Sequence, residues 1–194
     1  MPRPVIFYIR HGQTDWNAQY RFQGQQDIPL NETGRAQALG NGRKLAGIVG
    51  DGAGFDFLCS PLGRARETME IIREAMDLPR EGYAIEERLI EASYGELEGM
   101  SLTDIERDRP ELMELRDQDR WNFTPPNGES LAMVSQRIAP FFDGLVQPVI
   151  IVAHGAVGRT VRHHLAGTPT EAAAHYAFPQ DRIFRFEDGG EELI

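Results

Sequence analysis

Arg10 and His11 stand side by side at the end of a short apolar run, and Gly12 follows at once. An imidazole gains or loses a proton near neutral pH, and a guanidinium binds phosphate or carboxylate oxygens through its planar fork. The pair therefore predicts a site for a negatively charged substrate. Because a single Arg-His-Gly also occurs by chance, the prediction depends on what other segments contribute.

Two further segments carry residues suited to an anion. Arg64 and Arg66 fall in the first two turns of a predicted helix, where the helix dipole disfavours a cation unless an anion lies beside it. His154 follows another apolar run and precedes Gly155, where a second predicted helix begins with free amide groups. Taken singly, these residues would be surface arginines and a hydrogen-bonded core histidine, so the prediction rests on their convergence.

Apolar runs and helix-periodic segments alternate along the chain. Strands are predicted at 4–9, 55–60, 83–86, 148–153 and 182–188, the last of them at a sheet edge. Helices are predicted at 31–47, 61–76, 129–145 and 155–165, with N-caps at Asn31 and Ser60 and an end or kink at Pro140. Continuous apolar strands are typical of a sheet covered on both faces. The expected fold class is therefore α/β, a three-layer α/β/α sandwich around a mostly parallel central sheet.

Residues 100–128 form the polar, proline-bearing part of the chain, with short helices expected near Leu102 and Glu111. We interpret them as a small cap-like insertion packed over the sheet of one domain that spans residues 1–194. In an open parallel sheet, ligands bind at the carboxyl ends of the strands. Since the candidate anion-binding residues all follow predicted strands, we expect them to meet at one rim of the sheet.

Composition narrows the classes of partner. The formal net charge of −10 disfavours attraction to nucleic acid or to an anionic membrane. The single cysteine, Cys59, excludes an internal disulfide. No apolar run reaches membrane-spanning length, and Val5–Ile9 is too short for the core of a signal peptide. We therefore expect a cytoplasmic protein that binds a small metabolite; the sequence specifies no oligomeric state.

Four segments follow one another as they do in the histidine phosphatase superfamily, also called the phosphoglycerate mutase-like family. They are RHGQTDWN at 10–17, SPLGRARET at 60–68, ERLIEASYGELEG at 87–99 and VAHG at 152–155. The resemblance covers residues 5–155 and is stronger than any one motif, because the segments occur in the family's order. It implies phosphoryl chemistry through a transiently phosphorylated histidine.

The resemblance also implies roles for individual residues. His11 would be the nucleophile, and Glu91 would be the acid that protonates the leaving oxygen. Groups matching those that hold the phosphoryl oxygens are Arg10, Asn17, Arg64 and His154, with Gly155 adjacent. Groups matching the substrate mouth are Arg21, Gln23 and Gly24. Arg66 does not match the family's helix arginine.

These residue types fit the chemistry. A nucleophilic imidazole must be neutral, and nearby guanidiniums disfavour its protonated form. The same cations stabilise charge on the equatorial oxygens, so we expect positioning and electrostatics to replace a metal ion or cofactor. Gly12 would let the backbone approach the phosphate. A carboxylic acid opposite would donate a proton to the leaving oxygen and later take one from water.

Hydrolases and mutases share these motifs and differ in the insertion. Mutases resembling the glycolytic enzyme carry a longer insertion with adjacent arginines that hold the substrate carboxylate. Here the insertion ends in PPNGES and its arginines are separated, at Arg107, Arg109, Arg116 and Arg120. A mutase must also keep water from its phosphoenzyme, which a short cap does poorly. Hydrolysis of a small phosphomonoester is therefore the predicted activity, with mutase-type transfer as the alternative.

Two other classes stay open. A metallohydrolase would use His11 and His154 as ligands, although no histidine–carboxylate pair has ligand spacing and the arginines would repel a cation. An inactive domain would use the same pocket to recognise a phosphorylated partner. Sugar phosphates, phosphoglycerate, nucleotide-pathway intermediates and cobalamin-precursor phosphates all fit as substrates. Aromatic candidates for an apolar mouth are Trp16, Phe22, Trp121 and Phe123.

Overall fold

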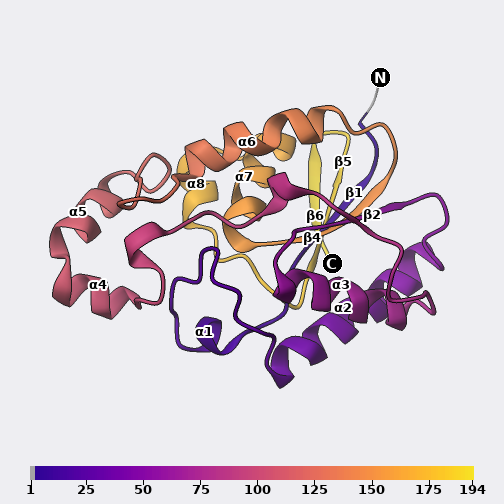
Figure 1. Cartoon of the computed structure of the whole chain (residues 1–194). Helices are drawn as coiled ribbons and strands as arrows, with labels where there is room; N and C mark the ends of the chain where they lie inside the picture. Colours follow the sequence, from indigo (N-terminus) through magenta and orange to yellow (C-terminus); the bar gives the residue numbers. More distant parts are fainter. Residues whose placement is uncertain (1–2) are drawn as a thin grey trace.

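A six-stranded sheet runs through the centre of the computed structural model, which describes residues 3–194 (Figure 1). The strand order is β3-β2-β4-β1-β5-β6. The strands are β1 (Ile6–Arg10), β2 (Asp56–Cys59), β3 (Ala84–Ile85), β4 (Val149–Ala153), β5 (Ile183–Glu187) and β6 (Gly190–Leu193). The pairs β3·β2, β2·β4 and β4·β1 are parallel, while β5 pairs antiparallel with both β1 and β6. The expectation of a mostly parallel sheet is confirmed.

Helices cover both faces of the sheet and complete the expected three layers (Figure 1). One face carries α2 (Glu32–Val49) and α3 (Gly63–Ala75), and the other carries α6 (Leu131–Asp143) and α7 (Gly155–Ala166). Asn31 caps α2 as predicted, its side chain accepting from Gly34 N at 2.9 Å. The shorter helices are α1 (Asp15–Ala18), α4 (Leu102–Asp108), α5 (Pro110–Gln118) and α8 (Thr170–His175), with 3-10 turns at Glu87–Leu89 and Gly95–Leu97.

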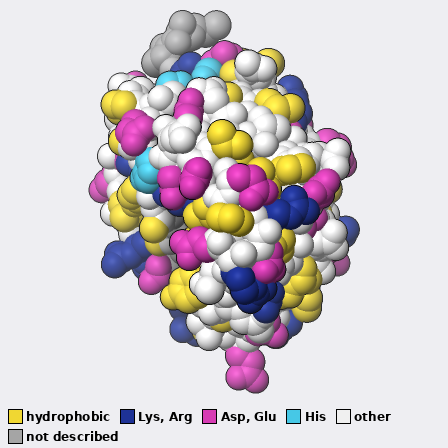
Figure 2. Space-filling model, turned by 90° about the vertical axis from the view of Figure 1, so that its left-hand side faces the viewer, with side chains coloured by type: hydrophobic (Ala, Val, Ile, Leu, Met, Phe, Trp, Pro, Cys, Tyr) yellow, Lys and Arg dark blue, Asp and Glu magenta, His cyan; other side chains and the backbone are white. Residues whose placement is uncertain are grey.

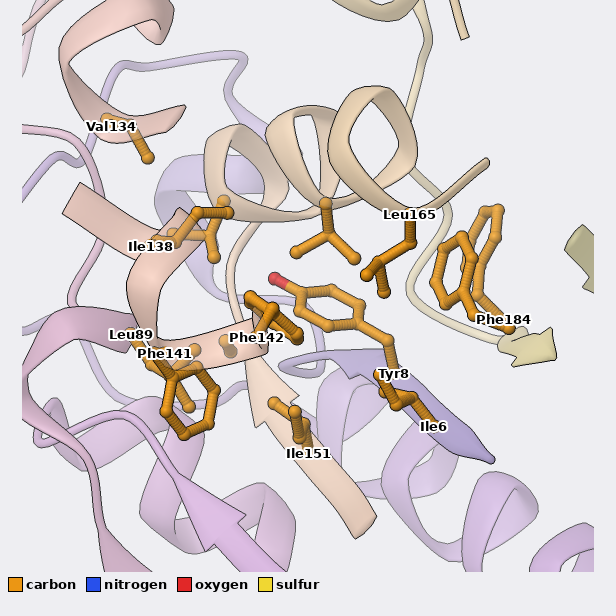
Figure 3. Close-up of a cluster of buried hydrophobic side chains, with 14 of the residues drawn as sticks. Ile6, Tyr8, Leu89, Val134, Ile138, Phe141, Phe142, Ile151, Leu165 and Phe184 are labelled. Carbon is orange, nitrogen blue, oxygen red and sulfur yellow. The ribbon is translucent and has the colours of Figure 1, made fainter. Parts of the chain in front are cut away.

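The larger core lies between the sheet and the α6–α7 layer (Figure 3). Tyr8 and Ile151 reach into it from β1 and β4, and Phe142 from α6, each 1% exposed or less. Burying side chains of this size stabilises the fold by roughly 1.5–3 kcal/mol each. Since β1 and β4 are thus fixed between packed layers, the residues at their carboxyl ends are held in place.

The structure corrects three local predictions. Ser60 does not cap a helix at Pro61: α3 begins at Gly63, and the Ser60 hydroxyl contacts His154 at 2.6 Å instead. Pro140 does not end its helix, and α6 continues to Asp143. The proline lies in the last turn, where its missing N–H costs one backbone hydrogen bond to the preceding turn. The strand β5 lies inside the sheet, because β6, which the sequence analysis did not predict, forms the edge.

The insertion contains both predicted short helices, α4 and α5, but they do not pack over the sheet. They lie beyond one end of it (Figure 1), where Leu97, Ile105 and Met113 form a small apolar cluster with Phe22 and Tyr94 at its edge. The buried residues of this cluster come from α4, α5 and the 3-10 turn Gly95–Leu97 rather than from strands, which explains the position. Figure 2, which faces this end, shows acidic, basic and apolar side chains interspersed. No helix within residues 3–194 is both long and apolar enough to cross a bilayer.

Candidate active site

A cleft of about 760 Å³ opens at the carboxyl ends of β1 and β4. Of the residues predicted from the sequence, those that line it are Arg10, His11, Asn17, Arg21, Gln23, Gly24, Arg64, Glu91 and Gly155. The remaining candidate, His154, lies behind the cleft wall and is fully buried, with its ring centroid 5.1 Å from that of His11. The tertiary structure therefore brings the predicted residues to one place.

His11 is held as a neutral imidazole with one defined lone pair. Its Nδ1 lies 2.7 Å from the carbonyl oxygen of Gly12, and the Nε of Arg64 donates to its Nε2 at 3.2 Å. Because a carbonyl accepts and a guanidinium donates, the proton is assigned to Nδ1 and the lone pair to Nε2. Burial, followed by the charges of Arg64 and Arg10, holds the pKa of His11 well below its ordinary value. The ring is therefore uncharged at neutral pH and carries only the Nδ1 proton.

Arg64 is anchored by the loop that precedes α2. Its terminal nitrogens donate to the carbonyl oxygens of Gln26 at 2.6 Å and Gly24 at 2.7 Å, and its side chain is 1% exposed. Asp27 lies 3.9 Å away and accepts from the amides of Gly63 at 2.9 Å and Arg64 at 3.3 Å. The anion expected at the start of α3 is therefore Asp27. Gly24 has φ of +54°, a left-handed conformation that favours glycine, and a Cβ there would lie 2.0 Å from a Glu98 carboxylate oxygen and displace that side chain.

Arg10 keeps part of its guanidinium free. One terminal nitrogen donates to the Phe178 carbonyl at 2.7 Å, whereas its buried Nε has no hydrogen-bond partner among residues 3–194. Burial lowers the pKa of Arg10 to about 10, Glu91 raises it and Arg159 lowers it further. Arg10 therefore stays charged at neutral pH and has a donor to offer an anion.

Two backbone amides, one of them in the first turn of α7, fix the Glu91 side chain. It is 7% exposed, and its two oxygens accept from Ala92 N at 3.0 Å and from Ala156 N at 3.3 Å. We had expected the free amides after Gly155 to face the substrate. Instead, one of them holds this carboxylate on the wall of the cleft.

Three other predicted residues, Asn17, Arg21 and Gln23, differ in the hydrogen bonds that their side chains form. The Oδ1 of Asn17 accepts from Gln180 at 2.9 Å and from Thr14 N at 3.2 Å, which fixes the amide at the cleft. Arg21 donates to the Gly99 carbonyl at 2.6 Å and lies 3.5 Å from the Asp104 carboxylate, which joins this loop to the insertion. Gln23 is buried, and its Oε1 has no partner in the described part of the chain.

Gly12 is required for a reason other than the predicted one. A Cβ there would lie 2.2 Å from the carbonyl oxygen of Gly34 on α2, and a Cβ on Gly34 would lie 2.1 Å from the Gln13 carbonyl. The glycine thus allows the turn after β1 to pack on a helix. Its amide donates to the Thr68 hydroxyl at 3.0 Å, which ties the same turn to α3.

Comparison with known proteins now decides the family. The model of the histidine phosphatase superfamily (branch 1) matches residues 6–193. This chain belongs to the histidine phosphatase superfamily. Proteins of this superfamily that resemble it include both phosphatases and phosphoglycerate mutases, so the chain is assigned to phosphoryl chemistry.

Two curated relatives of this chain carry different activities in their names. A 2,3-bisphosphoglycerate-dependent phosphoglycerate mutase of Cytophaga hutchinsonii is 32% identical over 94% of this chain and 88% of its own length. The uncharacterized phosphatase PhoE of Bacillus subtilis is 34% identical over 86% of this chain and 80% of its own length. Among solved structures, a mycobacterial glucosyl-3-phosphoglycerate phosphatase in complex with VO3 superposes with a TM-score of 0.79. It is 26% identical and covers 98% of this chain and 97% of its own.

Sequence reasoning missed part of the cleft. The additional lining residues that carry polar or aromatic side chains include Tyr94, Arg116, Arg120, Arg159, His175, Phe178 and Gln180. Arg116 and Arg120 had been noted as isolated, and Tyr94 lies within a quoted motif. Arg159 stands one helical turn beyond Gly155, which is a weak signal that it shares the cleft side of α7. The loop that carries Phe178 and Gln180 gave no signal.

Proposed function

We propose that this chain is a metal-independent hydrolase of small phosphomonoesters that works through a phosphohistidine on His11. The observation that carries the proposal is the state of that imidazole. Its proton is assigned to Nδ1, its Nε2 carries the lone pair that would attack phosphorus in exchange for the 3.2 Å contact with Arg64 Nε, and the guanidiniums of Arg64 and Arg10 line the same cleft. A buried neutral nucleophile next to fixed cations suits attack on a phosphate monoester.

The reaction proceeds in two balanced steps. In the first, the Nε2 lone pair forms a bond to phosphorus, the ester P–O bond breaks, and Glu91 protonates the leaving oxygen. In the second, Glu91 takes a proton from water, the water oxygen bonds to phosphorus, and the N–P bond breaks to release inorganic phosphate. Arg10 and Arg64 stabilise the charge spread over the phosphoryl oxygens throughout.

The open rim of the cleft favours hydrolysis over mutase-type transfer. Tyr20, His175 and Ala177 line the cleft and are exposed, so water has access to it. A mutase would have to protect its phosphoenzyme from that water. The insertion also lacks an adjacent arginine pair.

A direct assay separates the candidate activities. With 3-phosphoglycerate as the probe and excess EDTA present, we expect inorganic phosphate to accumulate, and addition of 2,3-bisphosphoglycerate to produce no net isomer. Isomerisation that requires the bisphosphate would establish the mutase alternative. Activity lost in EDTA and restored by one divalent cation would establish a metallohydrolase. Tight binding of many phosphate esters with no turnover would indicate a binding domain.

Three arginines in the same cleft as His11 support a narrower substrate class. Arg116, Arg120 and Arg159 line the same cleft and, with Phe22 and Tyr94, a narrow cavity of about 50 Å³ beside it. Within residues 3–194, Arg120 and Arg159 form no ion pair, and Arg116 has only the exposed Asp117 at 3.4 Å. Burial and then the charge of Arg120 lower the pKa of Arg116 to about 10. Such mutually repelling cations favour a substrate that carries a second anionic group.

The second anionic group can be tested with matched esters. The ratio of kcat/KM for 3-phosphoglycerate to that for glycerol 3-phosphate reports on the carboxylate alone. We expect Arg120→Gln to lower this ratio by about 10- to 100-fold, the scale of one or two charge-assisted hydrogen bonds. Arg107→Gln is the control, because Arg107 pairs with Asp108 outside the cleft. A wild-type enzyme that prefers glycerol 3-phosphate would contradict this substrate class.

A further inference from the structure

Two buried hydroxyls contact His154, that of Tyr8 at its backbone and that of Ser60 at its ring. The Tyr8 hydroxyl donates to the His154 carbonyl at 2.7 Å and accepts from the His154 amide at 3.1 Å. The parallel pairing of β1 with β4 ends at Arg10 and Ala153, so this buried amide lies beyond the ladder. A buried amide needs a partner, and the Tyr8 hydroxyl supplies it. Figure 3 shows Tyr8 in the core, fixed by the side chains around it.

Ser60 determines which nitrogen of the His154 ring carries the proton. Its Oγ lies 2.6 Å from His154 Nε2 and accepts from the Leu62 amide at 3.4 Å. Among residues 3–194, Nε2 is the one acceptor within reach of the Ser60 hydroxyl proton. Ser60 therefore donates to Nε2, and the ring proton lies on Nδ1.

The Nδ1 of His154 is left without any partner. It is buried and makes no hydrogen bond to the described part of the chain. Burial, followed by the charges of Arg64, His11 and Arg10, holds the pKa of His154 well below its ordinary value, so the ring stays neutral. A buried donor of this kind destabilises the protein unless a ligand accepts from it. This cost indicates that a ligand oxygen completes the site.

The position of His154 indicates which ligand oxygen accepts from its Nδ1–H. His154 does not line the cleft, yet its ring centroid lies 5.1 Å from that of His11. A phosphoryl group that bonds to His11 would lie beside this ring. An oxygen of that group is therefore suited to accept from the Nδ1–H.

We propose that Tyr8 and Ser60 are positioning residues that fix His154 as an Nδ1–H donor to the phosphoryl group while it is transferred to and from His11. The inference rests on the proposed phosphohistidine mechanism. Because the interaction forms during transfer, it stabilises the transition state more than the substrate complex. Loss of either hydroxyl should therefore lower kcat and leave KM little changed.

Kinetics of hydroxyl variants test the proposal. We expect Ser60→Ala to lower kcat by about 10- to 100-fold with KM within about 3-fold, and Ser60→Thr, which keeps the hydroxyl, to recover most of the loss. Tyr8→Phe should lower kcat in the same way. Ser135→Ala on α6 and Tyr83→Phe, whose hydroxyl contacts Glu70 away from the cleft, are the matched controls. Ser60→Thr as slow as Ser60→Ala, or a loss confined to KM, would overturn the proposal.

Nitrogen-15 NMR of His154 gives a readout that does not need turnover. We expect the wild-type ring to be neutral with its proton on Nδ1 at pH 7, and Ser60→Ala to populate both tautomers. A wild-type ring with its proton on Nε2 would refute the assignment even if the enzyme hydrolyses esters. Conversely, the expected tautomer in a protein that turns over no ester would overturn the proposed function. It would leave the assignment of the His154 proton by Ser60 in place.

Discussion

His11→Ala is expected to abolish turnover, with kcat falling by roughly 10⁴-fold or more, the scale seen when a catalytic nucleophile is removed. The variant loses the Nε2 lone pair that would bond to phosphorus, so the phosphohistidine cannot form. Steady-state hydrolysis of p-nitrophenyl phosphate measures the loss. His164→Ala is the control, because His164 contacts Asp143 away from the cleft.

Trapping the intermediate identifies the type of bond as well as the residue. Rapid quenching of wild-type enzyme with a ³²P-labelled ester should leave label on the protein that survives alkali and is lost in acid, as a phosphoramidate is. The label should be absent from His11→Ala. Label retained by that variant, or undiminished hydrolysis in a variant that unfolds at the wild-type temperature, would refute the nucleophile assignment.

Arg64→Gln carries the second-largest expected effect, a fall in kcat/KM of roughly 10²- to 10⁴-fold. The substitution removes the charge that would stabilise the phosphoryl oxygens. The Arg64 Nε–H donor, whose nitrogen lies 3.2 Å from His11 Nε2, is lost as well. It also removes donors from the Gly24 and Gln26 carbonyls, so part of the loss reflects a loosened loop. A stability measurement separates the two contributions.

The pH profile of Arg64→Gln should move in one direction. Burial is the largest cause of the low pKa of His11, and the charge of Arg64 is the next. Without that charge the pKa of His11 rises toward its ordinary value, and more of the ring is protonated at a given acidic pH. The acid limb of kcat/KM therefore moves to higher pH.

Arg66→Gln provides the matched control for the pH profile. Arg66 lies on the same helix two residues further along, where its Nε faces the Tyr83 hydroxyl at 3.4 Å. Its loss should leave both the rate and the acid limb within about 2-fold of wild type, as for most surface substitutions. An acid limb that stays in place in Arg64→Gln would show that Arg64 does not tune the nucleophile.

Short-range patterns were sufficient to predict most of the layers. Apolar runs predicted β1, β2 and β4 because strands covered on both faces need continuous hydrophobic side chains. The strand β6 was missed because Gly190–Leu193 is polar and exposed, and it is a strand only through its backbone bonds to β5. The helix α8 escaped prediction because its six residues are too few to show a period.

Local capping signals failed where a distant partner took the same group. Ser60 before a proline has the pattern of an N-cap, yet its hydroxyl contacts His154, 94 residues further along the chain. No property of the residues around Ser60 reports that partner. The amides at the start of α7 were likewise assigned to a substrate, whereas Glu91 comes from a separate loop to accept from one of them.

The sequence by itself determined the chemical inventory: an arginine and a histidine after β1, a second arginine on α3 and a second histidine after β4, in the order of one family. Strand ends could be predicted because hydrophobic periodicity is written locally. Only the tertiary structure decided the proton position on His11, because that depends on Arg64, 53 residues away, being pressed against it by the packing of α3 on the sheet. The low pKa of His11 and the grouping of Arg116, Arg120 and Arg159 have the same origin. Burial and electrostatic coupling are properties of assembled layers, and no single segment carries them.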